Sequence, residues 1–114
     1  MRLLLTLALA LPLAAQDWRW IHAGVVAHAL GSAADGWSSW GREEANPILA
    51  ERGRFQHRAV AIKAAEFGVT TAATYLIGRK QPKLRRLLGI VNLGMGTTYG
   101  AVAGWNWRSR GIVR

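Results

Sequence analysis

The chain has 114 residues, of which 51% are hydrophobic and 18% charged, with 15 Lys and Arg against 6 Asp and Glu. This length allows one domain, and the apolar content excludes a disordered basic tail. The chain has no cysteine, which excludes disulfides, thiolate metal sites and cysteine nucleophiles.

The formal net charge of +9 raises nucleic acid as a partner. The basic residues, however, stand in short blocks at the ends of apolar segments, as in residues 79–86 and 108–114. Basic flanks of this kind contact lipid headgroups and bias membrane topology. The sequence contains no recognised nucleic-acid-binding motif. We therefore expect the lipid bilayer as a partner and no nucleic acid.

The first 15 residues are typical of a secretory signal peptide. Met1-Arg2 gives a short positive start, residues 3–13 are apolar, and Ala14-Ala15 supplies small residues before a cleavage point. Leu13 is larger than the residue usually found three positions before such a cut. The alternative is an uncleaved signal anchor, which would add a fourth membrane helix.

Three apolar segments follow, and each is long enough for a membrane helix. The predicted spans cover about residues 20–40, 59–78 and 87–107. Tryptophans bracket the first span, as expected at membrane interfaces. The third span is free of charged residues. The predicted fold is therefore all-α, a small helical membrane bundle with three transmembrane helices in one domain, residues 16–114.

The connection between the first two spans contains a helix-start signal. Asn46-Pro47 combines an N-cap residue with proline at the first helical position. We therefore expect one long helix from Pro47 to Arg79, its first third outside the hydrocarbon. Gln81-Pro82 is expected to end it.

Small residues recur every four positions in each span. Close backbone approach along such residues is how helices gain contact in lipid. We expect packing through three ladders: Ala23, Ala27 and Gly31; Ala64, Gly68 and Ala72; and Gly96, Gly100 and Gly104. The contacts lie either within one chain or in a homo-oligomer or a complex with a larger membrane partner.

Ionisable residues inside spans are costly and usually meet a partner. Asp35 lies near the end of the first span and Lys63 near the start of the second, so a hairpin brings both to the same depth. We predict an Asp35–Lys63 ion pair, with Glu66 on the same helix face as Lys63 and able to compete for it. His28 shares a face with Asp35, which leaves a metal or ion site of His28, Asp35 and Glu66 as an alternative.

The stretch from Asp35 to Leu49 resembles a family of small bacterial membrane proteins of unknown function. In that family, Asp and a Ser/Thr pair precede Glu-x-Asn-Pro-Leu between two hydrophobic helices. The matching residues are Asp35, Ser38, Ser39, Glu44, Asn46 and Pro47, with Ile48 in place of Leu. The resemblance covers about 15 residues and implies a multi-span fold but no activity. A polar corner that joins the helices, or a ligand or ion-pair site, is predicted at Asp35, Ser38, Ser39, Glu44, Asn46, Lys63 and Glu66.

These patterns favour a structural or accessory protein of the bacterial inner (cytoplasmic) membrane. No catalytic motif is present, and no cofactor or metal is expected. Two alternatives remain open: a membrane-embedded enzyme or ion site using Asp35, Glu66 and His28, and a cationic pore-forming or holin-like protein. Basic residues are nearly balanced between the two predicted sides, so the positive-inside rule leaves the orientation open.

Overall fold

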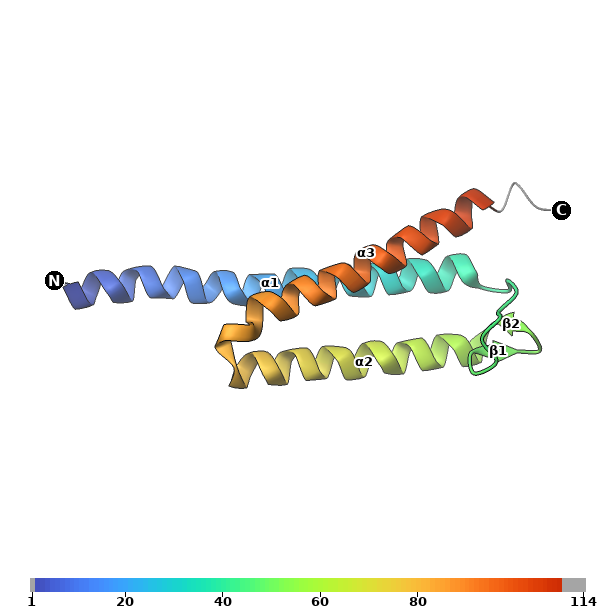
Figure 1. Ribbon diagram of the computed structural model, residues 1–114, viewed down its shortest axis with the longest axis horizontal. Coiled ribbons are helices and arrows are strands. Elements are labelled where there is room, and N and C mark those ends of the chain that lie inside the picture. Colours follow the sequence, from blue (N-terminus) through green and yellow to red (C-terminus); the bar gives the residue numbers. More distant parts are fainter. Residues whose placement is uncertain (1, 110–114) are drawn as a thin grey trace.

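The computed structural model describes the backbone of residues 2–109 and the side chains of residues 17–109. Three long helices dominate it: α1 (Arg2–Ser39), α2 (His57–Lys80) and α3 (Arg85–Ser109). A small hairpin of β1 (Ala50–Glu51) and β2 (Arg54–Phe55) joins α1 to α2, and the 3₁₀ helix η1 (Pro82–Leu84) joins α2 to α3. Helix α2 runs antiparallel to α1, and α3 returns parallel to α1 and packs across it (Figure 1).

The structure confirms a helical fold with three long helices. Two segments, residues 57–80 and 82–109, are long and apolar enough to cross a membrane. They contain the second and third predicted spans. The first predicted span is part of α1, which runs without interruption from Arg2. The predicted signal peptide, residues 1–15, falls where side chains lie outside the described residues.

The expected helix start at Asn46-Pro47 is wrong, because α2 begins only at His57. The Asn46 side chain instead closes a single turn, in which its Oδ1 accepts a hydrogen bond from the Ile48 amide at 3.0 Å. The chain then turns through Arg52 and Gly53, both with positive φ angles of 53° and 77°. This left-handed turn builds the antiparallel hairpin, which buries Phe55 to 2% exposure.

The predicted end of the second helix is confirmed. Helix α2 ends at Lys80, and Gln81 and Pro82 lead into η1. The Nε of Arg85 donates a hydrogen bond of 2.8 Å to the carbonyl of Gly78. Carbonyls in the last turn have no partner within the helix, so this bond satisfies one of them.

Helices α1 and α3 meet along a seam in which buried positions alternate at spacings of three and four residues. On α1 the seam consists of Ile21, Gly24, His28, Gly31, Asp35 and Ser38; on α3 it includes Gly89, Asn92, Gly96 and Ala103. This heptad-like spacing is what parallel helices show when they wrap along a shared line of contact. The seam is made of small and polar residues and only two apolar ones larger than glycine, Ile21 and Ala103.

The glycine contacts therefore repeat every seven residues, not every four. A Cβ atom on Gly24 would collide with the carbonyl of Gly89, and one on Gly31 with the carbonyl of Gly96. The four-residue ladders are therefore only partly in contact with another helix. A step of four residues turns the side-chain direction away from the neighbouring helix, whereas a step of seven residues returns it to nearly the same direction. Within the described chain, Gly68, Gly100 and Gly104 have no neighbouring element within 4 Å of a Cβ position. Their role between chains stays a prediction.

Apolar and polar side chains are distributed in the reverse of the usual order. Among residues 17–109, the buried hydrophobic residues are Ile21, Phe55, Ala59 and Ala103, whereas the buried polar ones are His28, Asp35, Ser38, Thr74 and Asn92. Large apolar side chains on all three helices are exposed, including Leu30, Trp37, Val69, Leu76 and Trp105. Soluble monomers rarely expose apolar surface on this scale.

Candidate functional site

The candidate site is a group of five side chains from three helices, which we call the polar cluster. His28 and Asp35 come from α1, Lys63 and Glu66 from α2, and Tyr99 from α3. With Ser32 and Phe67 they surround a cavity of about 10 Å³. That volume is close to the minimum for one water molecule. The cluster thus leaves little free space between its polar groups.

Asp35 is the most enclosed charge of the cluster, with 4% of its surface exposed. Its Oδ2 lies 3.1 Å from the Nζ of Lys63, so the ion pair expected from their depths is formed. Its Oδ1 accepts a hydrogen bond of 3.2 Å from the hydroxyl of Ser39, one helical turn later. Both carboxylate oxygens therefore have a partner, as a buried charge requires.

Glu66 does not compete with Asp35 for Lys63, because the ion pair that Lys63 forms is with Asp35. Glu66 instead accepts a hydrogen bond of 3.0 Å from the hydroxyl of Tyr99. The ammonium of Lys63 lies 4.9 Å from the centre of the Tyr99 ring, in a cation–π position. Tyr99 of α3 consequently contacts both charged residues that α2 contributes to the polar cluster.

His28 is almost fully buried and is held on three sides. Its ring stacks on Tyr99 at 5.8 Å between centroids and meets the edge of Phe67 at 5.0 Å. Its Nδ1 lies 3.0 Å from Oδ1 of Asn92. Since that amide oxygen can only accept, Nδ1 carries the hydrogen and donates it.

Asn92 connects all three helices. Besides accepting from His28 of α1, its Nδ2 donates to the hydroxyl of Thr74 in α2 and to the carbonyl of Leu88 in α3, both at 2.9 Å. Asn92 is 1% exposed, so its side-chain amide makes these hydrogen bonds inside the protein. Sequence reasoning missed this residue, although an asparagine in an uncharged apolar segment is a signal for an inter-helix bond.

The predicted polar corner is assembled in part. Asn106 of α3, also missed from the sequence, donates from Nδ2 to the hydroxyls of Ser38 at 3.2 Å and Ser39 at 3.0 Å. Ser38 in turn donates to the carbonyl of Asp35 at 3.1 Å. Arg42 then joins the end of α3 by hydrogen bonds of 3.1 Å to the Asn106 carbonyl and to the Ser109 hydroxyl.

The two remaining corner residues lie at its edge. The carboxylate of Glu44 accepts a hydrogen bond of 2.9 Å from the Asn46 amide, and both residues shape the exposed turn. Glu44 also lines a cavity of about 310 Å³ that reaches Asp35, Lys63 and Asn106, whereas Asn46 does not line it. Asn46 therefore serves the loop and not the site.

At the opposite end of the helices, aromatic and basic side chains are interleaved. The Nδ1 of His22 lies 2.7 Å from the Tyr75 hydroxyl, and Trp18 stacks on both rings. Arg85 lies 4.2 Å above the Trp18 ring and Arg86 5.2 Å above that of Trp20. These contacts tie the start of α3 to α1.

His28, Asp35 and Glu66 do not form the ion site that the sequence left as an alternative. Among the described residues, no three of His, Cys, Asp and Glu are grouped so that they could hold a metal ion. Each of the three is bonded to a different partner, namely Asn92, Lys63 and Tyr99. No known family model, curated protein or solved structure matches the chain.

Proposed function

We propose that the protein is a small integral protein of the bacterial inner membrane with a structural or accessory role. The observation that carries this proposal is the reversed distribution of side chains, with His28 and Asn92 buried at 1% exposure and Leu30 and Val69 exposed at 67% and 70%. In lipid, exposed apolar side chains are well solvated and buried polar ones bond helices together. In water the same arrangement would be unfavourable.

The ends of the helices support a common position in the bilayer. Trp18 and Trp20 lie with Arg85 and Arg86 at one end, and Trp40 lies against His57 at the other. Tryptophan and basic side chains are typical of the two interfaces. The 24 residues of α2 give a length of about 36 Å, enough to cross the hydrocarbon. Residues 17–39 of α1 run alongside and present their polar seam to α3.

The same position supports cleavage of the predicted signal peptide. Helix α1 continues beyond the turn between α2 and α3 towards its N-terminus (Figure 1). If the three helices share one bilayer, the apolar residues 3–13 would extend past the interface marked by Trp18 and Arg85. Removal of residues 1–15 avoids that cost. The intact mass of the purified protein tests this: cleavage after Ala15 is expected, and retention of Met1 would contradict it. Because residues 2–39 form one helix, an uncleaved start lengthens α1 and adds no fourth helix.

A structural role accounts for the polar cluster better than catalysis does. Asp35, Glu66 and His28 each bond to another helix and thereby hold α1, α2 and α3 together. The family resemblance of residues 35–49 belongs to the same proposal: Asp35 joins α1 to α2 through Lys63, and Ser39 joins α1 to α3 through Asn106. We assign no reaction, cofactor or pore to these groups.

Charge exchange between Asp35 and Lys63 tests the structural role. Removing one partner of a buried pair costs about 3–5 kcal/mol. Asp35→Lys and Lys63→Asp alone are therefore expected to lower the amount of membrane-inserted protein, and the double exchange is expected to restore it. Glu43→Lys with Arg52→Glu, an exchange of two exposed charges in the loop outside the helix seam, is the control and should leave the amount unchanged. If the double exchange is no better than either single variant, the structural role of the pair is refuted.

Membrane insertion itself is tested separately. After alkaline carbonate washing, an integral protein stays with the membrane pellet, and that is the expected result. Release into the supernatant would contradict the proposal.

A further inference from the structure

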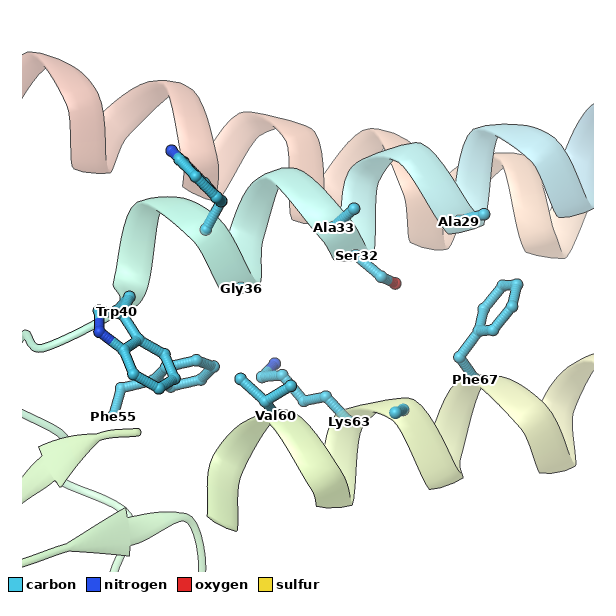
Figure 2. A pocket seen from close by; sticks show the side chains of 11 residues that line it. Ala29, Ser32, Ala33, Gly36, Trp40, Phe55, Val60, Lys63 and Phe67 are labelled. Carbon is cyan, nitrogen blue, oxygen red and sulfur yellow. The ribbon is translucent and has the colours of Figure 1, made fainter. Parts of the chain in front are cut away.

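A groove between α1 and α2 is left unfilled beside the polar cluster (Figure 2). Its volume is about 720 Å³. Ala29, Ser32, Ala33 and Gly36 form its α1 side, and Val60, Lys63 and Ala64 form its α2 side. Trp40 and Phe55 close one end and Phe67 narrows the other. We call it the α1–α2 groove.

The groove exists because both helices present small side chains here while two contacts hold them apart. The Asp35–Lys63 ion pair spans the gap on one side, with its atoms at 3.1 Å. Phe55, which is 2% exposed, lies at the end where the hairpin meets α2. Alanine and glycine cannot reach across the remaining space. Empty space of this size forfeits van der Waals contact on both walls, so an occupant is favoured.

We propose that the α1–α2 groove holds one acyl chain of a bilayer phospholipid, whose ester carbonyl accepts a hydrogen bond from Lys63 or Ser32. This inference rests on the proposed membrane location, because it takes the surrounding medium to be lipid. The volume lies within the range of about 300–1,000 Å³ found for small-molecule pockets. Besides the indole N–H groups of Trp37 and Trp40, the polar side-chain groups of the walls are the Lys63 ammonium and the Ser32 hydroxyl, both directed at the groove in Figure 2.

The two polar groups suit an ester carbonyl in number and depth. An ammonium has three hydrogens, and the Asp35 carboxylate accounts for one of those on Lys63. Lys63 lies six residues after the start of α2, about 9 Å along the helix. Trp40, an interfacial residue type, lies at the same end of the groove. The ester region of a phospholipid therefore fits beside Lys63, with its chain passing Ala33 and Ala29 towards Phe67.

A helix of a second copy fits this space poorly. With its side chains, an α-helix is about 10–12 Å wide. A single acyl chain has a much smaller cross-section. A groove that Trp40 and Phe55 close at one end and Phe67 narrows at the other suits the thinner occupant.

Neighbouring alanines of α2 supply a matched pair of variants. Ala64 lines the groove and Ala65 does not, and both are exposed positions of the same helix. Ala64→Phe fills the groove, whereas Ala65→Phe adds the same side chain on another face. Full-length proteins are purified in a mild detergent and examined by native mass spectrometry for retained phospholipid. Circular dichroism confirms that each variant is folded.

We expect the wild type and Ala65→Phe to retain one phospholipid and Ala64→Phe to retain at least fivefold less. Delipidated protein is then titrated with diester and diether phospholipids of equal chain length. Wild type should prefer the diester. A variant with Ser32→Ala, Asp35→Asn and Lys63→Met lacks both donors and leaves no buried charge unpaired, so it should lose that preference. Equal retention by the two phenylalanine variants, or none by wild type, overturns the groove proposal while leaving membrane insertion intact. Binding of a second protein copy in place of lipid would also overturn it.

Discussion

Gly31 of α1 and Gly96 of α3 face one another with no room for a side chain between them. A Cβ atom on Gly31 would meet the carbonyl oxygen of Gly96 and lie 2.9 Å from its Cα atom. Gly24 and Gly89 repeat the contact one heptad earlier. The separation of the two helices is therefore set by missing side chains, and it brings His28 and Asn92 within hydrogen-bonding distance.

Adding a methyl group at this contact should separate α1 from α3. A Cβ on Gly96 would lie 2.6 Å from the backbone nitrogen of His28, and backbone atoms cannot swing aside. Gly96→Ala is expected to lower the free energy of unfolding by about 1–3 kcal/mol, the usual range for overpacking. Thermal unfolding in detergent measures the loss. Gly100→Ala, with no neighbouring element within 4 Å in the described chain, is the control. An equal loss at Gly100 would place the packing face elsewhere.

Removing the amide of Asn92 should cost more than removing either of its partners. Asn92→Leu leaves the His28 Nδ1 hydrogen and the Thr74 hydroxyl without their bonds, since both partners are buried. A buried unsatisfied group costs about 1–3 kcal/mol. Thr74→Val removes one bond with little change of shape and should have a smaller effect. Chemical unfolding in detergent ranks the two variants, and the reverse order would contradict the network.

Tyr99→Phe separates the hydrogen bond from the ring contacts. The variant loses the bond from the hydroxyl to Glu66 but keeps the stack on His28 and the contact with Lys63. Inter-helix hydrogen bonds in membranes average about 0.6 kcal/mol, so the loss of stability should be small. Tyr99→Leu removes the ring as well and should be clearly less stable. If the two variants are equally stable, the aromatic ring of Tyr99 adds nothing to the stability beyond the hydrogen bond of its hydroxyl.

Cysteine labelling tests how the chain lies in the membrane, and the absence of native cysteine makes it free of background. Ile48 lies in the turn before β1 and Lys83 in η1, at opposite ends of α2. Ile48→Cys and Lys83→Cys should react with an impermeant maleimide from opposite sides of the membrane. Val69→Cys, on the exposed face midway along α2, should react only after detergent is added. Labelling of positions 48 and 83 from one side would contradict a crossing by α2.

The Asp35–Lys63 pair could be predicted from depth and charge together. Both residues lie about one helical turn inside the same end of adjacent segments, so a hairpin brings them to equal depth. Since an unpaired charge inside a span is costly, helix rotations that pair the two are favoured. The end of α2 at Gln81-Pro82 was equally local, because proline restricts the residue before it. Such features follow from chain direction and covalent structure.

The Asn46-Pro47 signal failed for a physical reason. Locally it favours a helix start, but residues 41–44 bond to residues 53–55, with Gly41 and Phe55 joined by a hydrogen bond of 2.8 Å. Gly53 supplies the positive φ angle that this hairpin needs, and Phe55 becomes buried. Tertiary burial outweighed a local cap, which contributes only about 1 kcal/mol.

The sequence by itself determined three things: that this chain forms apolar helices, where the connection between the last two helices lies, and which charged residues lie at the same depth along neighbouring helices. Only the tertiary structure decided which face of each helix is buried. Helical periodicity defines the faces of one helix, but the rotation of one helix against another depends on which side chains allow their backbones to touch. Gly31 and Gly96 allow it, and that contact, not the four-residue ladder of Gly96, Gly100 and Gly104, selects Asn92 and Tyr99 as partners of the buried His28.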